Sequence, residues 1–90
     1  MNYEEEVVEL LKEDSILHIL TGLSAECGEV NGLFQKNLLY ANHPITKEAL
    51  ISEIGDVLYY LTALYTKYHL SLKEIQEHNI AKIKSRRGIK

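Results

Sequence analysis

The sequence contains one cysteine, one proline and no tryptophan. With Cys27 alone, an internal disulfide is excluded, and no group of cysteine and histidine residues has the spacing of a zinc site. Uncharged runs such as 15–25 and 57–66 are shorter than the about 20 apolar residues that a membrane-spanning helix needs. Because 46% of the residues are hydrophobic and 26% are charged, we predict a globular chain with a single domain over residues 1–90.

Positive charge is also scarce. The 13 acidic residues outnumber the 10 basic ones, which gives a formal net charge of −3 at pH 7. This balance argues against a nucleic-acid partner bound through a basic face, and the short apolar runs argue against a membrane partner. The N-terminal sequence is acidic, unlike the start of a signal peptide, so we expect a cytoplasmic location. A chain this small buries little surface by itself, which favours a homo-oligomer.

Helical periodicity dominates the sequence, and no segment alternates as a half-buried strand does. Apolar residues recur at helical spacing over Tyr3–Glu13, Ile16–Leu39, Thr46–Tyr68 and a segment from Ser71 to about Lys84–Arg86. The only strong break is the cluster around Pro44, which separates the two longest segments. Because two long helices joined by a short loop fold back on each other, we predict an all-α protein. An antiparallel helical hairpin is flanked by two shorter helices and assembles into an oligomeric helical bundle.

The apolar stripes of these helices predict which residues face inward. In the last segment we expect Leu72, Ile75 and Ile83 to be buried, and Cys27 is predicted to be a small core residue of the second. Ser71 begins a capping box with Glu74, which marks the start of the last helix. The four histidines have no ligand spacing with one another, so we do not predict them as metal ligands.

Acidic residues three positions apart are neighbours on one face of a helix. The sequence has four such pairs: Glu6/Glu9, Glu26/Glu29, Glu53/Asp56 and Glu74/Glu77. On a helical wheel the first and last pairs lie away from the apolar face, and we interpret them as solvent-facing charge. The two central pairs lie at the edges of apolar stripes that should face each other. The alternative interpretation of these two pairs is an exposed edge of the hairpin.

Carboxylates that converge in a partly dry groove repel one another, and a hard cation removes that repulsion. Mg²⁺ prefers oxygen ligands and often binds substrate phosphates as well. We therefore predict a Mg²⁺ site, for which Mn²⁺ could substitute, and a phosphate-bearing substrate. The predicted metal ligands are Glu26, Glu29, Glu53 and Asp56.

Further polar residues are candidates for substrate binding. Asn79 interrupts the apolar face of the last helix, with Lys82 and Arg86 on the same side, and these bases could bind phosphate oxygens. The alternative is that the bases only complement the helix dipole. Lys36, on the flank of Glu29, is a phosphate candidate or a base extended over apolar surface. Tyr60, on the flank of Asp56, could contact a sugar or base, or be a core aromatic.

These motifs together resemble the MazG-like nucleotide pyrophosphohydrolases of the all-α NTP pyrophosphatase superfamily. The resemblance rests on Glu26-Cys27-Gly28-Glu29, on Glu53-Ile54-Gly55-Asp56-Val57-Leu58-Tyr59-Tyr60-Leu61, and on the closing segment from Asn79 through Lys82 to Arg86. It covers most of the chain, about residues 17–87. Either carboxylate pair alone would be unspecific, whereas the two pairs with the closing segment are a more specific pattern.

The resemblance implies an enzyme that hydrolyses a nucleoside or deoxynucleoside triphosphate between the α and β phosphates. The products would be a nucleoside monophosphate and pyrophosphate, and a typical role is the removal of unwanted nucleotides. The resemblance also implies that the four carboxylates hold Mg²⁺, that Asn79, Lys82 and Arg86 contact the nucleotide, and that the chain forms a dimer or tetramer. We expect Glu26 to accept the proton of the attacking water.

Two other functions fit the same pattern. One is a phosphoribosyl-ATP pyrophosphatase-like enzyme, but the run K-x-G-E-E associated with that branch is absent around Glu26, and Tyr60 stands where that branch tends to have histidine. The other is a non-catalytic helical module for oligomerisation or regulation, which would have no need of all four carboxylates.

Overall fold

The computed structural model describes residues 1–90, which form four α-helices and no strand. The helices are α1 (Tyr3–Leu10), α2 (Ile16–Leu39), α3 (Lys47–Lys67) and α4 (Leu72–Arg86). The predicted all-α class, with a central hairpin and two shorter flanking helices, is therefore confirmed. The predicted bounds of α2 agree with the structure, and those of α3 differ only by the capping residues at its two ends.

The ends of the helices are fixed by side chains that the sequence places beside them. Ser15 caps α2 by accepting a hydrogen bond from the backbone N–H of His18, and Thr46 caps α3 in the same way. The predicted capping box of α4 is present, since Ser71 and Glu74 each accept a hydrogen bond from the other's backbone N–H. Helix α1 ends at Leu10, earlier than predicted, because Leu11 adopts an extended conformation.

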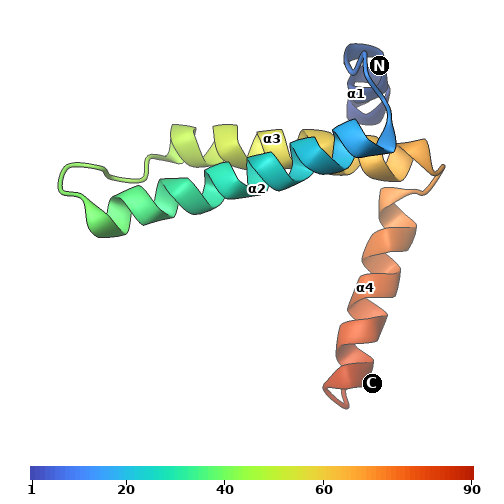
Figure 1. The fold of residues 1–90 in the computed structure, drawn as a ribbon. Helices are drawn as coiled ribbons and strands as arrows, with labels where there is room; N and C mark the ends of the chain where they lie inside the picture. Colours follow the sequence, from blue (N-terminus) through green and yellow to red (C-terminus); the bar gives the residue numbers. More distant parts are fainter.

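Helices α2 and α3 lie side by side and antiparallel, as Figure 1 shows. The loop between them includes Pro44 and Asn42, whose φ of 62° lies in the left-handed region that asparagine tolerates. The side-chain amide of Asn37 donates a hydrogen bond to the backbone carbonyl of His43, which ties the loop to the end of α2. This hairpin holds the residues of its two helices in a fixed register.

The core is small and lies at the end of the hairpin where α3 finishes. Helix α1 packs across α3 there, and Val7 and Ile19 are completely or almost completely buried beside Ala63. Thr62 and Tyr65 are the only other buried residues of the chain. Most of the apolar residues that we expected inside the hairpin are therefore exposed in the single chain.

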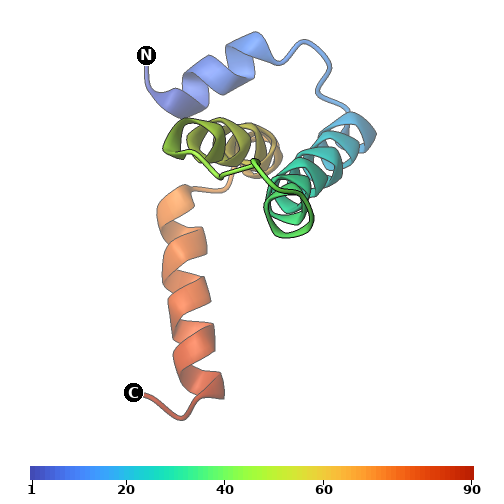
Figure 2. The same cartoon turned by 90° about the vertical axis from the view of Figure 1, so that its left-hand side faces the viewer.

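Helix α4 projects away from the other helices and does not run along the hairpin, as Figures 1 and 2 show. The prediction that Leu72 and Ile75 are buried is wrong for the single chain, where both are exposed, and Ile83 is half-buried. His69, with a φ of 57°, and the residues after it set the direction in which α4 leaves α3. The radius of gyration is 16.1 Å, whereas a compact domain of this length would have about 12 Å.

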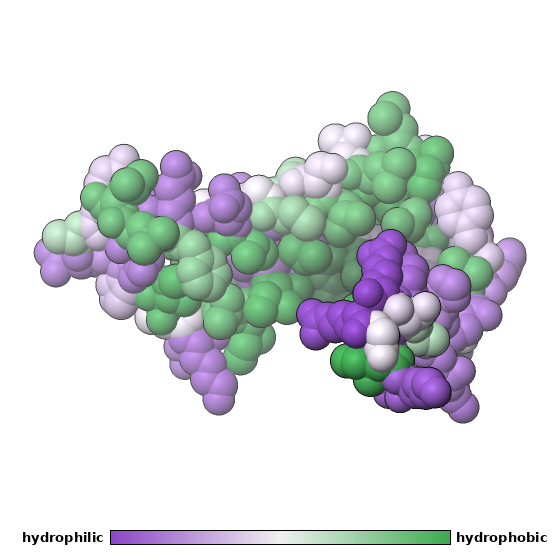
Figure 3. All heavy atoms as spheres, turned by 90° about the horizontal axis from the view of Figure 1, so that it is seen from below, coloured by the Kyte–Doolittle hydropathy of each residue, from purple (hydrophilic) through white to green (hydrophobic).

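Exposed apolar side chains extend over much of the hairpin. Figure 3 shows them along the face on the side from which α4 projects. The large exposed hydrophobic residues of α2 and α3 include Leu20, Phe34, Leu38, Ile51, Ile54, Leu58 and Leu61. No helix is long and apolar enough to cross a membrane.

Candidate metal and nucleotide site

Three of the four predicted metal ligands come together between α2 and α3. Glu26 lies in the middle of α2, and Glu53 and Asp56 occupy successive turns of α3. One carboxylate oxygen of each residue lies within 4.8 Å of the others. Glu26 and Glu53 are half-buried, whereas Asp56 is exposed. We call Glu26, Glu53 and Asp56 the carboxylate cluster.

Glu29, the fourth predicted ligand, lies one turn further along α2 and is exposed. It does not belong to the three residues whose oxygens converge. Its negative charge nevertheless contributes to the raised pKa of Glu26, so it lies near the cluster along the line where α2 meets α3, which we call the groove.

The electrostatic consequence of the cluster is a raised pKa for Glu26. Removal from water is the main cause, the charges of Asp56, Glu53 and then Glu29 add to it, and a hydrogen bond shared with Asp56 contributes as well. No base offsets these charges, because the one ion pair of the chain joins Lys73 and Glu77 on the surface of α4. A set of oxygen ligands with excess negative charge suits a hard divalent cation.

Tyr60 continues the row of Glu53 and Asp56 by one more turn of α3. Its ring lies against α2 at Gly22, the one glycine of α2 where an added Cβ would overlap a neighbouring side chain. The rings of His18 and Tyr59 approach Tyr60 edge-on, with centroids at 6.0 and 5.3 Å. Tyr60 is half-buried by these contacts, which place it at one end of the carboxylate cluster.

The sequence pattern did not single out His18 and Gly22. Both face the site because His18, Gly22 and Glu26 are spaced four residues apart and so lie in one row along α2. The spacing is visible in the sequence, but only the contact with Tyr60 shows that His18 and Gly22 lie at the site. Cys27, in contrast, is exposed, so its prediction as a core residue is wrong.

The remaining predicted substrate-binding residues lie away from the cluster. Lys36 is exposed on α2, two turns beyond Glu29. Asn79, Lys82 and Arg86 are exposed on α4, and the single chain does not bring them to the carboxylates. Asn79 and Lys82 instead line a shallow hollow along α4 together with Leu70, Glu74, Ile75 and His78.

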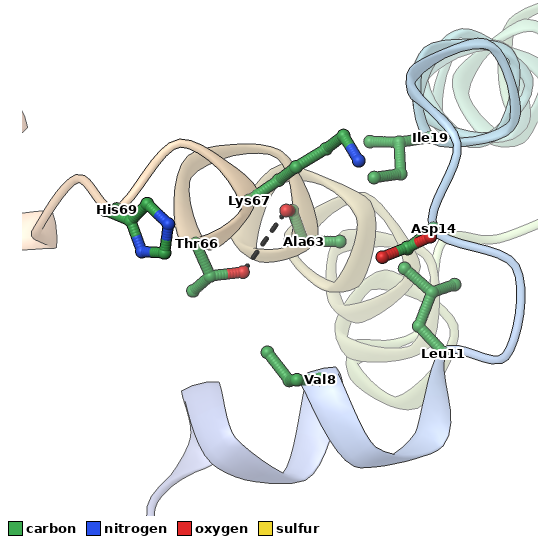
Figure 4. A pocket seen from close by; sticks show the side chains of 8 residues that line it. All are labelled: Val8, Leu11, Asp14, Ile19, Ala63, Thr66, Lys67 and His69. Carbon is green, nitrogen blue, oxygen red and sulfur yellow. Dashed lines mark hydrogen bonds between the residues drawn. The ribbon is translucent and has the colours of Figure 1, made fainter.

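A separate cavity of about 270 Å³ lies between α1, the start of α2 and the end of α3. Figure 4 shows the apolar side chains of Val8, Leu11 and Ile19 around it, with Asp14, Lys67 and His69 at its border. Thr66 uses its hydroxyl hydrogen within its own helix, where it donates to the carbonyls of Thr62 and Ala63. None of the predicted metal or substrate residues lines this cavity.

The model of the MazG nucleotide pyrophosphohydrolase domain matches residues 4–88. Apart from Tyr3, the first residue of α1, this range includes all four helices, and it contains every residue of the carboxylate cluster. No curated protein and no solved structure matches the chain.

Proposed function

This chain belongs to the MazG nucleotide pyrophosphohydrolase domain family, and on that basis we propose that it is a Mg²⁺-dependent nucleoside triphosphate pyrophosphohydrolase. The reaction cleaves between the α and β phosphates of a ribo- or deoxyribonucleotide. Its proposed role is the removal of unwanted nucleotides in the cytoplasm. The observation that supports it best is the convergence of Glu26, Glu53 and Asp56 without any base among them.

The ligands of the proposed ion are the carboxylate cluster and Glu29. These oxygen donors fit Mg²⁺ or Mn²⁺ and not a soft ion, which would favour sulfur. A bound Mg²⁺ supplies positive charge to the phosphate oxygens and a means of orienting water for attack in line with the leaving group. The carboxylate cluster, with Glu29, would hold that charge between α2 and α3.

Glu26 is the proposed general base. It is half-buried, which limits its competition with bulk water, and when one of its carboxylate oxygens binds the ion the other is free to accept a proton. Water adds to the α phosphorus, its proton passes to a Glu26 carboxylate oxygen, and the bond from the α phosphorus to the bridging oxygen breaks. Pyrophosphate leaves, and the nucleoside monophosphate remains to be released.

The basic side chains are proposed to bind the phosphates that the carboxylates cannot. Lys36 is on the same helix as Glu26, two turns beyond Glu29, so it would serve the site of its own chain. Asn79, Lys82 and Arg86 lie on α4, which projects away, so we propose that they serve the site of another copy of the chain. Tyr60 is the proposed contact for the nucleoside.

An oligomer would explain why so little of this chain is buried. Only 5 of 90 residues are buried, and an isolated helix of the length of α4 is marginal in water. A second copy, in a dimer or tetramer, would cover the apolar residues of α4 and of the hairpin at the same time. It would also bring the basic end of α4 to a negatively charged groove, where opposite charges favour the encounter.

A panel of nucleoside triphosphates, assayed with Mg²⁺ and with a chelator, tests the proposal. Product analysis should find pyrophosphate and a monophosphate with Mg²⁺, and nothing with the chelator. Glu29→Gln and Asp56→Asn should each lose at least about 100-fold in kcat/KM, while Glu9→Gln, an exposed acid on α1, should not. Release of orthophosphate would mean that the enzyme cleaves a different phosphate bond. A preference for phosphoribosyl-ATP would mean that it is a phosphoribosyl-ATP pyrophosphatase-like enzyme. Absence of turnover with every nucleotide would leave a binding or assembly module.

A further inference from the structure

Tyr60 is held in place by a feature of α2 that has a cost to the helix. A Cβ built on Gly22 would lie 2.7 Å from Cδ1 of Tyr60 and closer still to two other ring atoms, so alanine cannot stand there with the ring in place. Glycine destabilises a helix interior relative to alanine. By contrast, an added Cβ at Gly32, in the same helix, would meet nothing within 4 Å. The position of the Tyr60 ring therefore requires glycine at position 22, although alanine there would make the helix itself more stable.

Two aromatic neighbours fix the orientation of the same ring. His18 approaches it at an interplanar angle of 64°, and Tyr59 at 89°, both in edge-on geometry. Such pairs are favourable because the positive edge of one ring meets the negative face of another. With Gly22 beneath it and two rings beside it, Tyr60 has little freedom to turn.

The position of this ring gives the groove a direction. Tyr60 lies four residues beyond Asp56, which is about 6 Å along the axis of α3. Since the helices are antiparallel, Gly22 and then His18 run from Glu26 in the same direction. In the opposite direction along α2 come Glu29 and then Lys36, a base suited to phosphate. One end of the groove is thus aromatic, and the other is charged.

We infer that the substrate lies along this groove with its nucleoside at Tyr60 and its β and γ phosphates toward Lys36, and that Gly22 and His18 are positioning residues for the Tyr60 ring. The inference rests on the proposed function, since it assigns the orientation of a nucleotide in that site. An aromatic ring in this place can stack on any nucleobase, so the contact would set affinity for nucleotides as a class.

The test compares two phosphate compounds in the full-length protein: a nucleoside triphosphate and methyl triphosphate, which has the phosphates without the nucleoside. Tyr60→Ala and Gly22→Ala should raise KM for the nucleotide about 10-fold, with kcat and the affinity for Mn²⁺ little changed. Neither variant should alter kcat/KM for methyl triphosphate. Gly32→Ala is the matched control and should behave as the parent.

A double variant isolates the contact. If Gly22 exists to admit the ring, Gly22→Ala should raise KM no further once Tyr60→Ala is present. His18→Ala should raise KM, and His18→Phe, which keeps an aromatic edge, should restore it. Should Gly22→Ala fail to fold, Tyr60→Ala and the two His18 variants still decide the question.

Equal losses on both compounds would overturn the inference, because the ring would then act on the fold or on the phosphates. Binding of an α,β-methylene nucleotide, measured by calorimetry with Mn²⁺, separates this result from failure of the proposed function. If the parent protein shows no turnover, the proposed enzymatic function is contradicted, but the assigned orientation of the bound nucleotide is not. Binding that Tyr60→Ala leaves unchanged contradicts the assigned orientation.

Discussion

Glu26 of α2 and Asp56 of α3 hold carboxylate oxygens within 4.8 Å of each other across the hairpin. Each helix brings one negative charge to the contact, and the pKa of Glu26 rises as water is removed and as the charge of Asp56 opposes its own. Like charges at this distance are tolerated when a proton or a cation lies between them. When both carboxylates are ionised and no cation is bound, their repulsion therefore destabilises the folded hairpin.

Removal of one of these charges should have opposite effects with and without metal. In a chelator, Asp56→Asn should unfold at a higher temperature than the parent, because it relieves repulsion. With millimolar Mn²⁺ the parent should gain stability, since an ion that binds the folded state raises the midpoint, and the variant should gain little. Thermal unfolding under both conditions measures this, with Glu9→Gln as the control. If Mn²⁺ does not change the unfolding temperature of the parent, either with or without nucleotide, the proposed metal site is contradicted.

The raised pKa of Glu26 predicts how stability changes with pH. The folded chain holds this proton more tightly than the unfolded chain, where the pKa is near 4.5. Without metal, the penalty for ionising Glu26 should be absent below pH 4.5 and should grow as the pH rises through the raised value. The difference between the parent and Glu26→Gln in chemical denaturation should follow this course. A constant difference over that range would contradict it.

Protons and metal should compete for the same oxygens. The affinity for Mn²⁺ should fall as the pH is lowered through the raised pKa of Glu26, because the protonated carboxyl is a poor ligand. Titration calorimetry at several pH values measures this, and proton uptake by the buffer should accompany binding. In the control Glu9→Gln the same dependence should remain.

Docking of α1 onto α3 should depend on one of two adjacent valines. Val7 is 1% exposed in the core, whereas Val8 is 60% exposed. Val7→Ala should lower the free energy of unfolding by about 2 kcal/mol through lost burial and an unfilled cavity. Val8→Ala should change it by less than about 0.5 kcal/mol. Denaturant unfolding of the two variants measures the contrast, and equal losses would mean that α1 packs differently.

A site that takes α4 from another copy should be restored by mixing two inactive variants. Asp56→Asn lacks a ligand of the metal, and Arg86→Ala lacks the basic residue of α4. In a mixed dimer, one of the two sites combines intact carboxylates with an intact α4. Since about half of the dimers in an equal mixture are mixed, the mixture should regain about a quarter of the parent activity. Each variant alone stays inactive. If mixing restores nothing while size measurements show exchange of subunits, the bases serve their own chain.

The sequence was sufficient for much of the fold, because the helix boundaries depend on local signals. Ser15, Thr46 and Ser71 are capping residues whose effect extends over one turn, and all three mark the starts of helices. The early end of α1 is not predictable in this way, because no glycine or proline stands near Leu11. The pairing of the two carboxylate motifs was predictable as well, since it requires only that α2 and α3 be antiparallel.

Burial was less predictable, because it depends on what lies beside a helix. The stripe on α4 is real in the sequence, yet Leu72 and Ile75 are exposed, since no helix of the same chain covers them. In the same way, the importance of Gly22 follows from a contact with Tyr60, 38 positions away along the chain. Such contacts are properties of the packed helices, and no local pattern encodes them.

The separation of α4 from the hairpin has a consequence for the time course of maturation. Contacts within a helical hairpin are close in sequence and form quickly, whereas burial of α4 by another copy requires two chains to meet. The hairpin of a newly made chain would therefore be folded before its α4 is covered by another copy. Activity should appear after a lag that shortens as the concentration of the chain rises, and it should fade again on dilution.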